Sequence, residues 1–463
     1  MSIVLYGAGI VGERTYRLLQ QFNIEVAFFV DSDKNKCKQL FCGKKVVSIE
    51  QFSKYHKKYS VIITASLRYY MEIKSILLSM GVPAEHIISK EVVLVEKIRY
   101  QADSLRKGKQ LTYLFDMGDG ANFGGVETLT IQFMEGLKLR GYFTKAIFPG
   151  NLQLIPKTLK NDIIPFALEE KVLSQKITEM VSTIINMLPC VIILSHVNYC
   201  FVAASIVKRC YPEMIKVNLM IHGGDMESLE RAYQASSYLN VLLCVGDYIR
   251  KEMIYSYGIN PDKVKYHASP VKCDADYVRK ECFNTGAIRI GYAGRIIVAQ
   301  KRADLIPQLM EALVHRNVEF ELHIAGEGPY LAELKQRVKK IDSLNQVYWY
   351  GRLEHSEMDK FWKSVDLFLN VSEFEGMSIS MLEAMSFACV PVMTKVDGVE
   401  EFVQDGKNGF LCPIGEVNEL ADRIAYLSKD RSRLAELGRE ARAIIEKKCN
   451  LERYIDYLLH VNE

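Results

Sequence analysis

One stretch of the chain decides its fold: Val371-Ser-Glu-Phe-Glu375-Gly376-Met-Ser378-Ile-Ser-Met-Leu-Glu383-Ala-Met-Ser-Phe-Ala-Cys-Val-Pro391-Val-Met393. The pattern predicts an apolar strand over 367–371, a Glu-Gly turn, a helix over 378–387 and a second strand over 390–394. Glu375 and Glu383 are eight residues apart, so we expect both on one side, at the carboxyl end of a parallel sheet. Carboxylates there accept hydrogen bonds from ligand hydroxyls, and the helix amino terminus favours anions. The alternative is an ordinary strand-turn-helix with an acidic first turn.

A pair of cations follows the strand predicted at 288–293. Arg295 lies two residues after that strand, and Lys301 comes six residues later, where we expect the next helix to start. Arg presents a planar fork of donors and Lys a point charge, so the pair is suited to hold a diphosphate from two directions. A surface ion pair is the alternative.

Together these motifs resemble the E-x7-E and Gly-Arg-x-x-x-Lys signatures of the retaining glycosyltransferases of family 4, which have the GT-B fold. The resemblance covers residues 110–463 and is strongest over 291–413. It implies an α/β protein with two Rossmann-like domains facing a cleft. The expected ranges are 110–275, joined by the last helix 450–463, for the acceptor domain and 283–449 for the donor domain.

The resemblance also implies roles for single residues. Glu375 would hold hydroxyls of the donor sugar and Glu383 the ribose, and Arg352 would lie near the base. Amides of Gly376, Met377 and Ser378 would face the diphosphate. The family usually has Phe and Gly where this chain has Met377 and Ser378, a difference that concerns the fit of the donor sugar.

The amino-terminal half of the same fold carries a glycine-rich turn and two histidines. Gly124-Gly125-Val-Glu resembles the Gly-Gly-x-Glu element that opens this half beside the cleft. His196 and His222 follow predicted strands, where cleft residues of open α/β sheets lie. We expect both to contact the donor sugar or its phosphate; satisfied structural histidines are the alternative. A helix is expected over 248–257.

Residues 1–100 predict a further, small Rossmann-like domain. Gly7, Gly9 and Gly12 lie between a strand and a helix, and Asp31 ends the second strand, a pattern typical of a turn around a pyrophosphate with an acid on the ribose. The segment resembles the nucleotide-sugar-binding domain of bacterial sugar acyltransferases. A structural module without a ligand is the alternative.

Bulk composition excludes several classes of protein. The 463 residues are too many for one core and suggest about three domains at ~150 residues each. The net charge of +3 argues against nucleic-acid binding. No apolar segment reaches the ~20 residues that span a bilayer, and the eleven cysteines form no metal or disulfide pattern, so we expect a cytoplasmic protein. Peripheral attachment to the inner face of the cell membrane stays open.

The resemblance implies transfer of a sugar, with retention, from a UDP or GDP sugar to a glycan or lipid-linked acceptor in cell-surface polysaccharide synthesis. No metal or other cofactor is required if Arg295 and Lys301 neutralise the diphosphate. A noncatalytic nucleotide-sugar-binding partner subunit and a GT-B sugar-nucleotide epimerase are the alternatives. A dehydrogenase would rest on the first domain alone.

Overall fold

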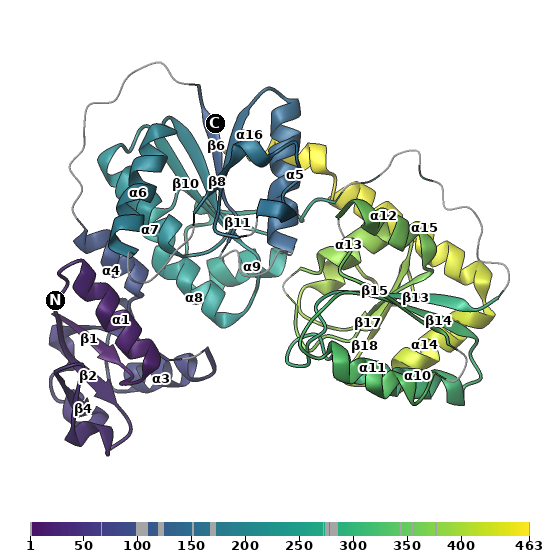
Figure 1. Ribbon diagram of the computed structural model, residues 1–463, viewed down its shortest axis with the longest axis horizontal. Coiled ribbons are helices and arrows are strands. Elements are labelled where there is room, and N and C mark those ends of the chain that lie inside the picture. Colours follow the sequence, from purple (N-terminus) through teal and green to yellow (C-terminus); the bar gives the residue numbers. More distant parts are fainter. Residues whose placement is uncertain are drawn as a thin grey trace.

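A computed structural model describes residues 2–65, 67–98, 110–118, 125–150, 152–166, 173–271, 273, 277, 286–342, 345–353, 355–375 and 377–462. Within these residues the strands form three sheets, of five, seven and six strands. Figure 1 shows one lobe for each sheet, with the amino-terminal domain (purple) at one end, a middle domain (blue to teal) and the carboxy-terminal domain (green to yellow) at the other end.

The amino-terminal domain has the sheet order β3-β4-β2-β1-β5, and its pairs are parallel except for β3–β4. The strands are β1 (Ser2–Tyr6), β2 (Val26–Asp31), β3 (Leu40–Phe41), β4 (Lys44–Ser48) and β5 (Tyr59–Ile63). The helices are α1 (Ile10–Gln21), α2 (Ile49–Phe52), α3 (Leu67–Ser79) and α4 (Lys90–Lys97). The glycine turn lies between β1 and α1, so this segment is Rossmann-like as predicted.

The middle domain has the order β12-β11-β10-β9-β6-β7-β8, with every neighbouring pair parallel. The strands are β6 (Thr112–Asp116), β7 (Phe143–Phe148), β8 (Ile163–Pro165), β9 (Cys190–Leu194), β10 (Ile215–Ile221), β11 (Val241–Cys244) and β12 (Val264–Tyr266). The helices are α5 (Gly125–Leu139), α6 (Leu173–Asn186), α7 (Tyr199–Cys210), α8 (Met226–Ala235) and α9 (Asp247–Lys251). All of β9 is buried, which explains its unbroken apolar sequence: helices cover both faces of a parallel sheet.

The carboxy-terminal domain has the order β15-β14-β13-β16-β17-β18, again with parallel pairs. The strands are β13 (Ile288–Ala293), β14 (Phe320–Ala325), β15 (Val347–Gly351), β16 (Leu367–Asn370), β17 (Val390–Thr394) and β18 (Phe410–Cys412). The helices are α10 (Ile306–His315), α11 (Leu331–Lys339), α12 (His355–Ser364), α13 (Ile379–Ser386) and α14 (Val417–Lys429). The opening stretch is therefore β16, a turn, α13 and β17.

The last two helices join the two larger domains. Helix α15 (Arg431–Lys448) packs on α13, and α16 (Leu451–Val461) packs on α5 of the middle domain (Figure 1). Tyr454 of α16 stacks on Phe133, with 4.8 Å between ring centroids. A Cβ at Gly136 would lie 2.0 Å from Cδ1 of Ile455, so α5 needs glycine where α16 crosses it.

The amino-terminal domain is docked on the middle domain through a shared apolar core and through polar contacts. Lys74 of α3 pairs with Glu230 of α8, and both side chains are largely buried. The Nη1 and Nη2 atoms of Arg209 in α7 each donate to a carbonyl at the end of α4, those of Val95 and Ile98, at 2.6 Å. The domain is thus held by side chains on helices of both partners.

The helix expected over 248–257 is present: α9 is continued by one π-helical turn, Glu252–Ser256. Another local prediction was wrong. The helix expected to start at Lys301 begins later, because a 3-10 turn, Ala303–Leu305, precedes α10. Lys301 therefore lies in a loop, which frees its side chain to point at the neighbouring strand end.

Candidate functional site

Glu375 and Lys301 form the centre of the site. They follow β16 and β13, adjacent strands of the carboxy-terminal sheet, and Lys301 Nζ lies 2.6 Å from Glu375 Oε1. The same oxygen accepts from Ser372 Oγ at 2.6 Å and from Asn370 Nδ2 at 3.1 Å. Among the described residues, Oε2 of Glu375 has no hydrogen-bond partner. One oxygen thus fixes the carboxylate, and the other stays available to a ligand.

Arg295 stands beside this pair. Its side chain is exposed, and Nη2 donates to Gln300 Oε1 at 2.7 Å. A Cβ at Gly294 would lie 3.9 Å from Lys301 Nζ, so the ammonium group sits directly above the strand end. The structure brings Arg295, Lys301 and Glu375 together on one sheet edge, where Lys301 pairs with Glu375.

The turn and the start of α13 form a small pocket next to Glu375. Its lining includes Met377, Ser378, Asp397 and Gly398. Ser378 is the N-cap of α13 and its Oγ accepts from Met381 N–H at 3.3 Å. Met377 packs against the cores of both larger domains. Gly376 lies outside the described residues.

Glu383 has a different environment from Glu375. It is a half-buried residue of α13, and burial raises the pKa of its carboxyl to about 7; the side chain of Trp362 acts against this rise and Asp359 adds to it. Glu383 does not line the pocket of Glu375. The placement of both glutamates on one side and the ribose role of Glu383 stay predictions.

Arg352 lies two strands away from Arg295 on the same edge. It directly follows β15, whose last residue, Gly351, accepts from Gly326 N–H at 2.7 Å. The Arg352 side chain is exposed. The edge therefore offers Arg352, Arg295 with Lys301, and Glu375 in spatial order along β15, β13 and β16.

Across the cleft, the middle sheet presents a buried acid. Asp116 ends β6, and its carboxyl accepts from Asn198 Nδ2 at 3.0 Å and from the backbone of Ser195, Gly118 and His196. Burial, the largest effect, raises its pKa to about 7. Asp116 thereby clamps the turn that carries His196 against the turn that follows β6.

The two predicted histidines are neighbours at this edge. Their ring centroids lie 6.4 Å apart; His196 is exposed and His222 is half-buried. Burial lowers the pKa of His222 to about 3, with the charge of His196 as a second cause. His222 is therefore neutral near pH 7, and its Nε2 is buried without a partner among the described residues.

The glycine-rich turn of the middle domain reaches the donor half. A Cβ at Gly125 would lie 3.3 Å from Cγ1 of Ile379, the first residue of α13. Gly125 thus faces the first residue of α13, next to Ser378. Gly124 lies outside the described residues.

In the amino-terminal domain, the carboxylate of Asp31 bonds to the backbone of the glycine turn. Asp31 Oδ2 accepts from Ala8 N–H at 2.8 Å and lies 3.2 Å from Lys36 Nζ. Gly7 has φ +116°, and a Cβ at Gly12 would lie 2.0 Å from Gly7 O, while a Cβ at Gly9 would meet nothing within 4 Å. The structure brings the four predicted residues together, with the carboxylate already bonded to the turn.

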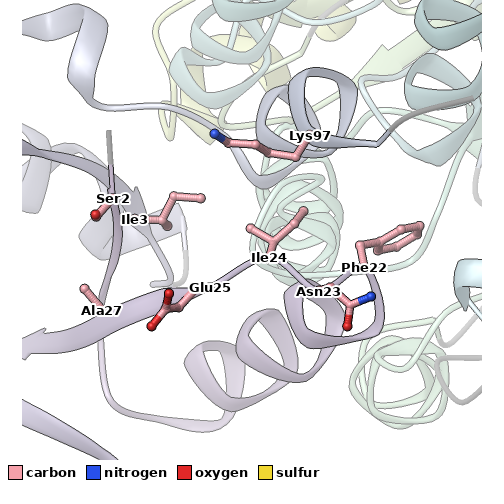
Figure 2. A pocket seen from close by; sticks show the side chains of 8 residues that line it. All are labelled: Ser2, Ile3, Phe22, Asn23, Ile24, Glu25, Ala27 and Lys97. Carbon is pink, nitrogen blue, oxygen red and sulfur yellow. The ribbon is translucent and has the colours of Figure 1, made fainter.

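Other candidate features are few. Over the described residues there is no group of three or more His, Cys, Asp or Glu side chains that could hold a metal ion. Within the same ranges, no helix is long and apolar enough to cross a membrane. A cavity of about 390 Å³ lies at the amino-terminal edge of the first sheet between Ser2, Phe22, Glu25 and Lys97 (Figure 2), away from the glycine turn.

Comparisons with known proteins found a family match in two parts of the chain. Residues 275–444 match the family described as Glycosyl transferases group 1, and residues 1–88 match the family described as C2185-like, N-terminal. The first match contains Arg295, Lys301, Glu375 and Glu383. The second covers the strands of the amino-terminal domain; the likeness to sugar acyltransferases stays a prediction.

Two curated relatives are glycosyltransferases. The chain is 28% identical over 173 residues to poly(ribitol-phosphate) alpha-N-acetylglucosaminyltransferase of Staphylococcus aureus, covering 37% of this chain and 34% of that protein. It is 30% identical over 170 residues to lipopolysaccharide core biosynthesis mannosyltransferase of Rhizobium meliloti, covering 35% of this chain and 48% of that protein. The chain thus spans less than half the length of these relatives.

Solved structures share the fold. TarM superposes with a TM-score of 0.63 at 14% identity, covering 77% of this chain and 99% of that chain. HepE from Anabaena, solved with UDP and glucose, gives 0.61 at 16% identity and covers 76% and 100%. The two larger domains therefore have the GT-B fold. The amino-terminal α/β domain is additional to these two domains.

Sequence reasoning missed three residues of these sites. Asp116 stands at a strand end before a glycine-rich turn, a position that could have marked it. Lys36 lies five residues after Asp31 in a lysine-rich loop, and the lysines of such a loop are usually solvated. Tyr248 approaches the pocket of Glu375 from the other domain, and nothing in its local sequence indicates this.

Proposed function

We propose that this protein is a retaining glycosyltransferase of family 4 type. It would move a sugar from a nucleoside diphosphate sugar, a UDP or GDP sugar, to a hydroxyl of a glycan or lipid-linked acceptor in cell-surface polymer synthesis. The observation that carries the proposal is the cluster of Arg295, Lys301 and Glu375 on one sheet edge of a GT-B fold. The names of the similar proteins, which act on poly(ribitol-phosphate) and lipopolysaccharide core, support the acceptor class.

The cations would act on the leaving group. When the anomeric C–O bond breaks, a diphosphate gains charge, and preorganised donors stabilise that charge best where water is excluded. Lys301 is 16% exposed and Arg295 lies nearer to solvent, so they would contact the diphosphate from the inner and the outer side. The amide groups at the start of α13 would add partial positive charge.

Glu375 and the middle domain would position the sugar. Oε2 of Glu375 would accept from sugar hydroxyls while Oε1 stays fixed to Ser372 and Asn370. His222, neutral near pH 7 with a buried Nε2, would face the same sugar from the other side of the cleft. The acceptor oxygen would attack from the face that the diphosphate leaves, and a diphosphate oxygen would take its proton, which conserves the anomeric configuration.

The binding test uses a thermal-shift panel of UDP, GDP, ADP and dTDP sugars and NAD. A compound that binds the folded state raises the melting temperature by mass action. We expect a UDP or GDP sugar to stabilise the wild type and Lys301→Ala to lose that shift. A shift with NAD that Lys301→Ala keeps would instead favour a working site in the amino-terminal domain.

The reaction test follows release of the nucleoside diphosphate with and without an acceptor polymer. Acceptor-dependent release with an axial product linkage from an axial donor would support retention. Conversion of the donor to an isomeric nucleotide sugar without release would favour an epimerase. Binding without either reaction, across a panel of acceptors, would favour a noncatalytic subunit.

A further inference from the structure

The ring of Tyr248 packs against the backbone of three glycines, Gly224, Gly246 and Gly398, which together we call the seat of this ring. Tyr248 lies in α9 of the middle domain. A Cβ would lie 2.4 Å from the ring at Gly224, 2.8 Å at Gly246 and 2.4 Å at Gly398. Such distances do not occur between real Cβ atoms and ring carbons. The ring therefore packs directly on backbone, and this packing requires glycine at all three positions.

The seat spans both larger domains. Gly224 belongs to the turn after β10 that carries His222, whereas Gly398 belongs to the turn after β17 and lines the pocket of Glu375. Beside the seat, Asp247 N–H donates to Glu401 Oε2 at 3.2 Å, and Lys448 Nζ donates to Glu401 O at 2.8 Å. One tyrosine thus contacts the turns of both halves at the point where they approach each other.

The electrostatics keep the Tyr248 hydroxyl protonated. Burial raises its pKa to about 12, the charges of Asp397, Asp225 and Glu375 add to that rise, and a backbone hydrogen bond from Gly224 opposes it. The side chain therefore presents a neutral phenol to a region surrounded by carboxylates. A phenol avoids the repulsion that another carboxylate would meet there.

We propose that Tyr248 is a positioning residue that holds the two GT-B domains in contact and fixes the Asp397–Gly398 turn beside Glu375. The proposal rests on the proposed function for its kinetic consequence but not for its structural one. Removal of the ring would leave the turn without its support and would favour a more open arrangement of the domains. A ligand that binds the closed arrangement then binds more weakly in proportion to the lost population.

The test compares Tyr248→Ala and Tyr248→Phe with Tyr255→Ala as the matched control. Tyr255 lies in the adjoining π-helical turn and is 79% exposed, so its removal takes away a tyrosine without the seat. Small-angle scattering of the ligand-free chains should show a larger radius of gyration for Tyr248→Ala and no change for Tyr248→Phe or Tyr255→Ala. With UDP or GDP sugar as donor, KM should rise about tenfold in Tyr248→Ala, because a tenfold smaller closed population weakens binding tenfold.

A double-mutant cycle examines the seat itself. Gly224→Ala should reproduce the defects of Tyr248→Ala, because the new Cβ displaces the ring. In the Tyr248→Ala background the same substitution should add little, because the space is then empty. Gly224 is the better choice than Gly398, whose φ of +78° strains any substitution. Should Tyr248→Ala fail to fold, Gly224→Ala alone replaces it as the test, because the new Cβ displaces the ring while the tyrosine is kept.

The outcomes separate the two proposals. No donor turnover by the wild type would contradict the proposed function, while the scattering and the glycine cycle would still decide the role of Tyr248. A wild-type radius of gyration and donor KM in Tyr248→Ala, or additive effects in the cycle, would overturn the positioning role.

Discussion

Two parts of this molecule use the same ingredients, a glycine turn and a lysine-carboxylate pair at the carboxyl end of a parallel strand. In the amino-terminal domain, Lys36 and Asp31 lie 3.2 Å apart, with side chains 45% and 9% exposed. In the carboxy-terminal domain, Lys301 and Glu375 lie 2.6 Å apart, at 16% and 7%. Burial of the cation is the main difference between the two pairs. It decides the strength of each electrostatic interaction, because water screens an exposed ammonium group.

The carboxylates also differ in what they bond. Asp31 accepts from Ala8 N–H of its own glycine turn, so it stabilises the conformation of that turn. Glu375 accepts from Ser372 and Asn370 through one oxygen, and its other oxygen has no described partner. The first pair holds a loop, and under the proposed function the second pair would exchange its Lys301–Glu375 contact for contacts with a ligand.

The largest expected effect is that of replacing Lys301, the cation of the buried pair. Lys301→Ala should lower kcat for transfer by about 10²–10³-fold, the usual loss when one group that stabilises developing charge is removed. The measurement is release of the nucleoside diphosphate under saturating donor. Lys339→Ala, an exposed lysine on α11, is the matched control and should keep wild-type activity. Wild-type kcat in Lys301→Ala would contradict the role of the buried pair.

The next effect concerns the contact between the amino-terminal domain and the middle domain. Lys74→Ala leaves Glu230 buried without its cation, although Gln234 Nε2 still donates to it at 2.9 Å. Loss of one partner of a buried pair costs about 3 kcal/mol, so urea unfolding should show a destabilised chain. Arg17→Ala breaks an exposed pair with Glu13 and should cost under about 1 kcal/mol. Equal effects of the two variants would mean that Lys74 is as well solvated as Arg17.

These long-range partners show where sequence-based prediction ends. Local patterns predict the alternation of strands and helices and the position of the turns, because turn residues and apolar runs act over a few positions. They also predict that Arg295 and Lys301 lie in one loop. Lys74 and Glu230 are 156 residues apart, and Tyr248 and Gly398 are 150 apart, so their contacts depend on how whole domains pack. No local period encodes such a pair. Asp116 is intermediate: its strand-end position is readable, but its bond to Asn198 is not.

A smaller effect is the pH dependence of stability that the buried carboxyls of the two GT-B domains cause. The folded-state pKa of Asp116 is raised to about 7 from 3.8, and that of Glu383 to about 7 from 4.5. Each carboxyl therefore stabilises the fold while it is protonated, and this contribution is lost as pH rises from the unfolded value through about 7. Wild-type melting temperature should fall over this window for that reason.

Amides remove these titrations. Asp116→Asn and Glu383→Gln should each flatten the fall between pH 5 and pH 8 by a few degrees, because about 1 kcal/mol shifts the melting temperature by ~2–4 °C in domains of this size. Their effects should add, since the residues belong to different domains. Glu375→Gln is the comparison variant at a carboxylate with a cation partner. A slope unchanged in both amide variants would show that neither buried acid titrates in this range.

The smallest expected effect is that of replacing Lys36, the cation of the exposed pair in the amino-terminal domain. Lys36→Ala removes a cation that is 45% exposed, while Asp31 keeps the N–H groups of Ala8 and Asp33 at 2.8 and 2.9 Å. The stability cost should stay below about 1 kcal/mol, and transfer should remain within about twofold of wild type. The thermal-shift panel makes the variant informative beyond this small cost. If the amino-terminal turn only holds its own loop, Lys36→Ala shows the same nucleotide shifts as the wild type. A shift that disappears in Lys36→Ala and persists in Lys301→Ala would instead mean that the exposed pair serves a second nucleotide site, and that burial alone does not separate a working pair from a structural one.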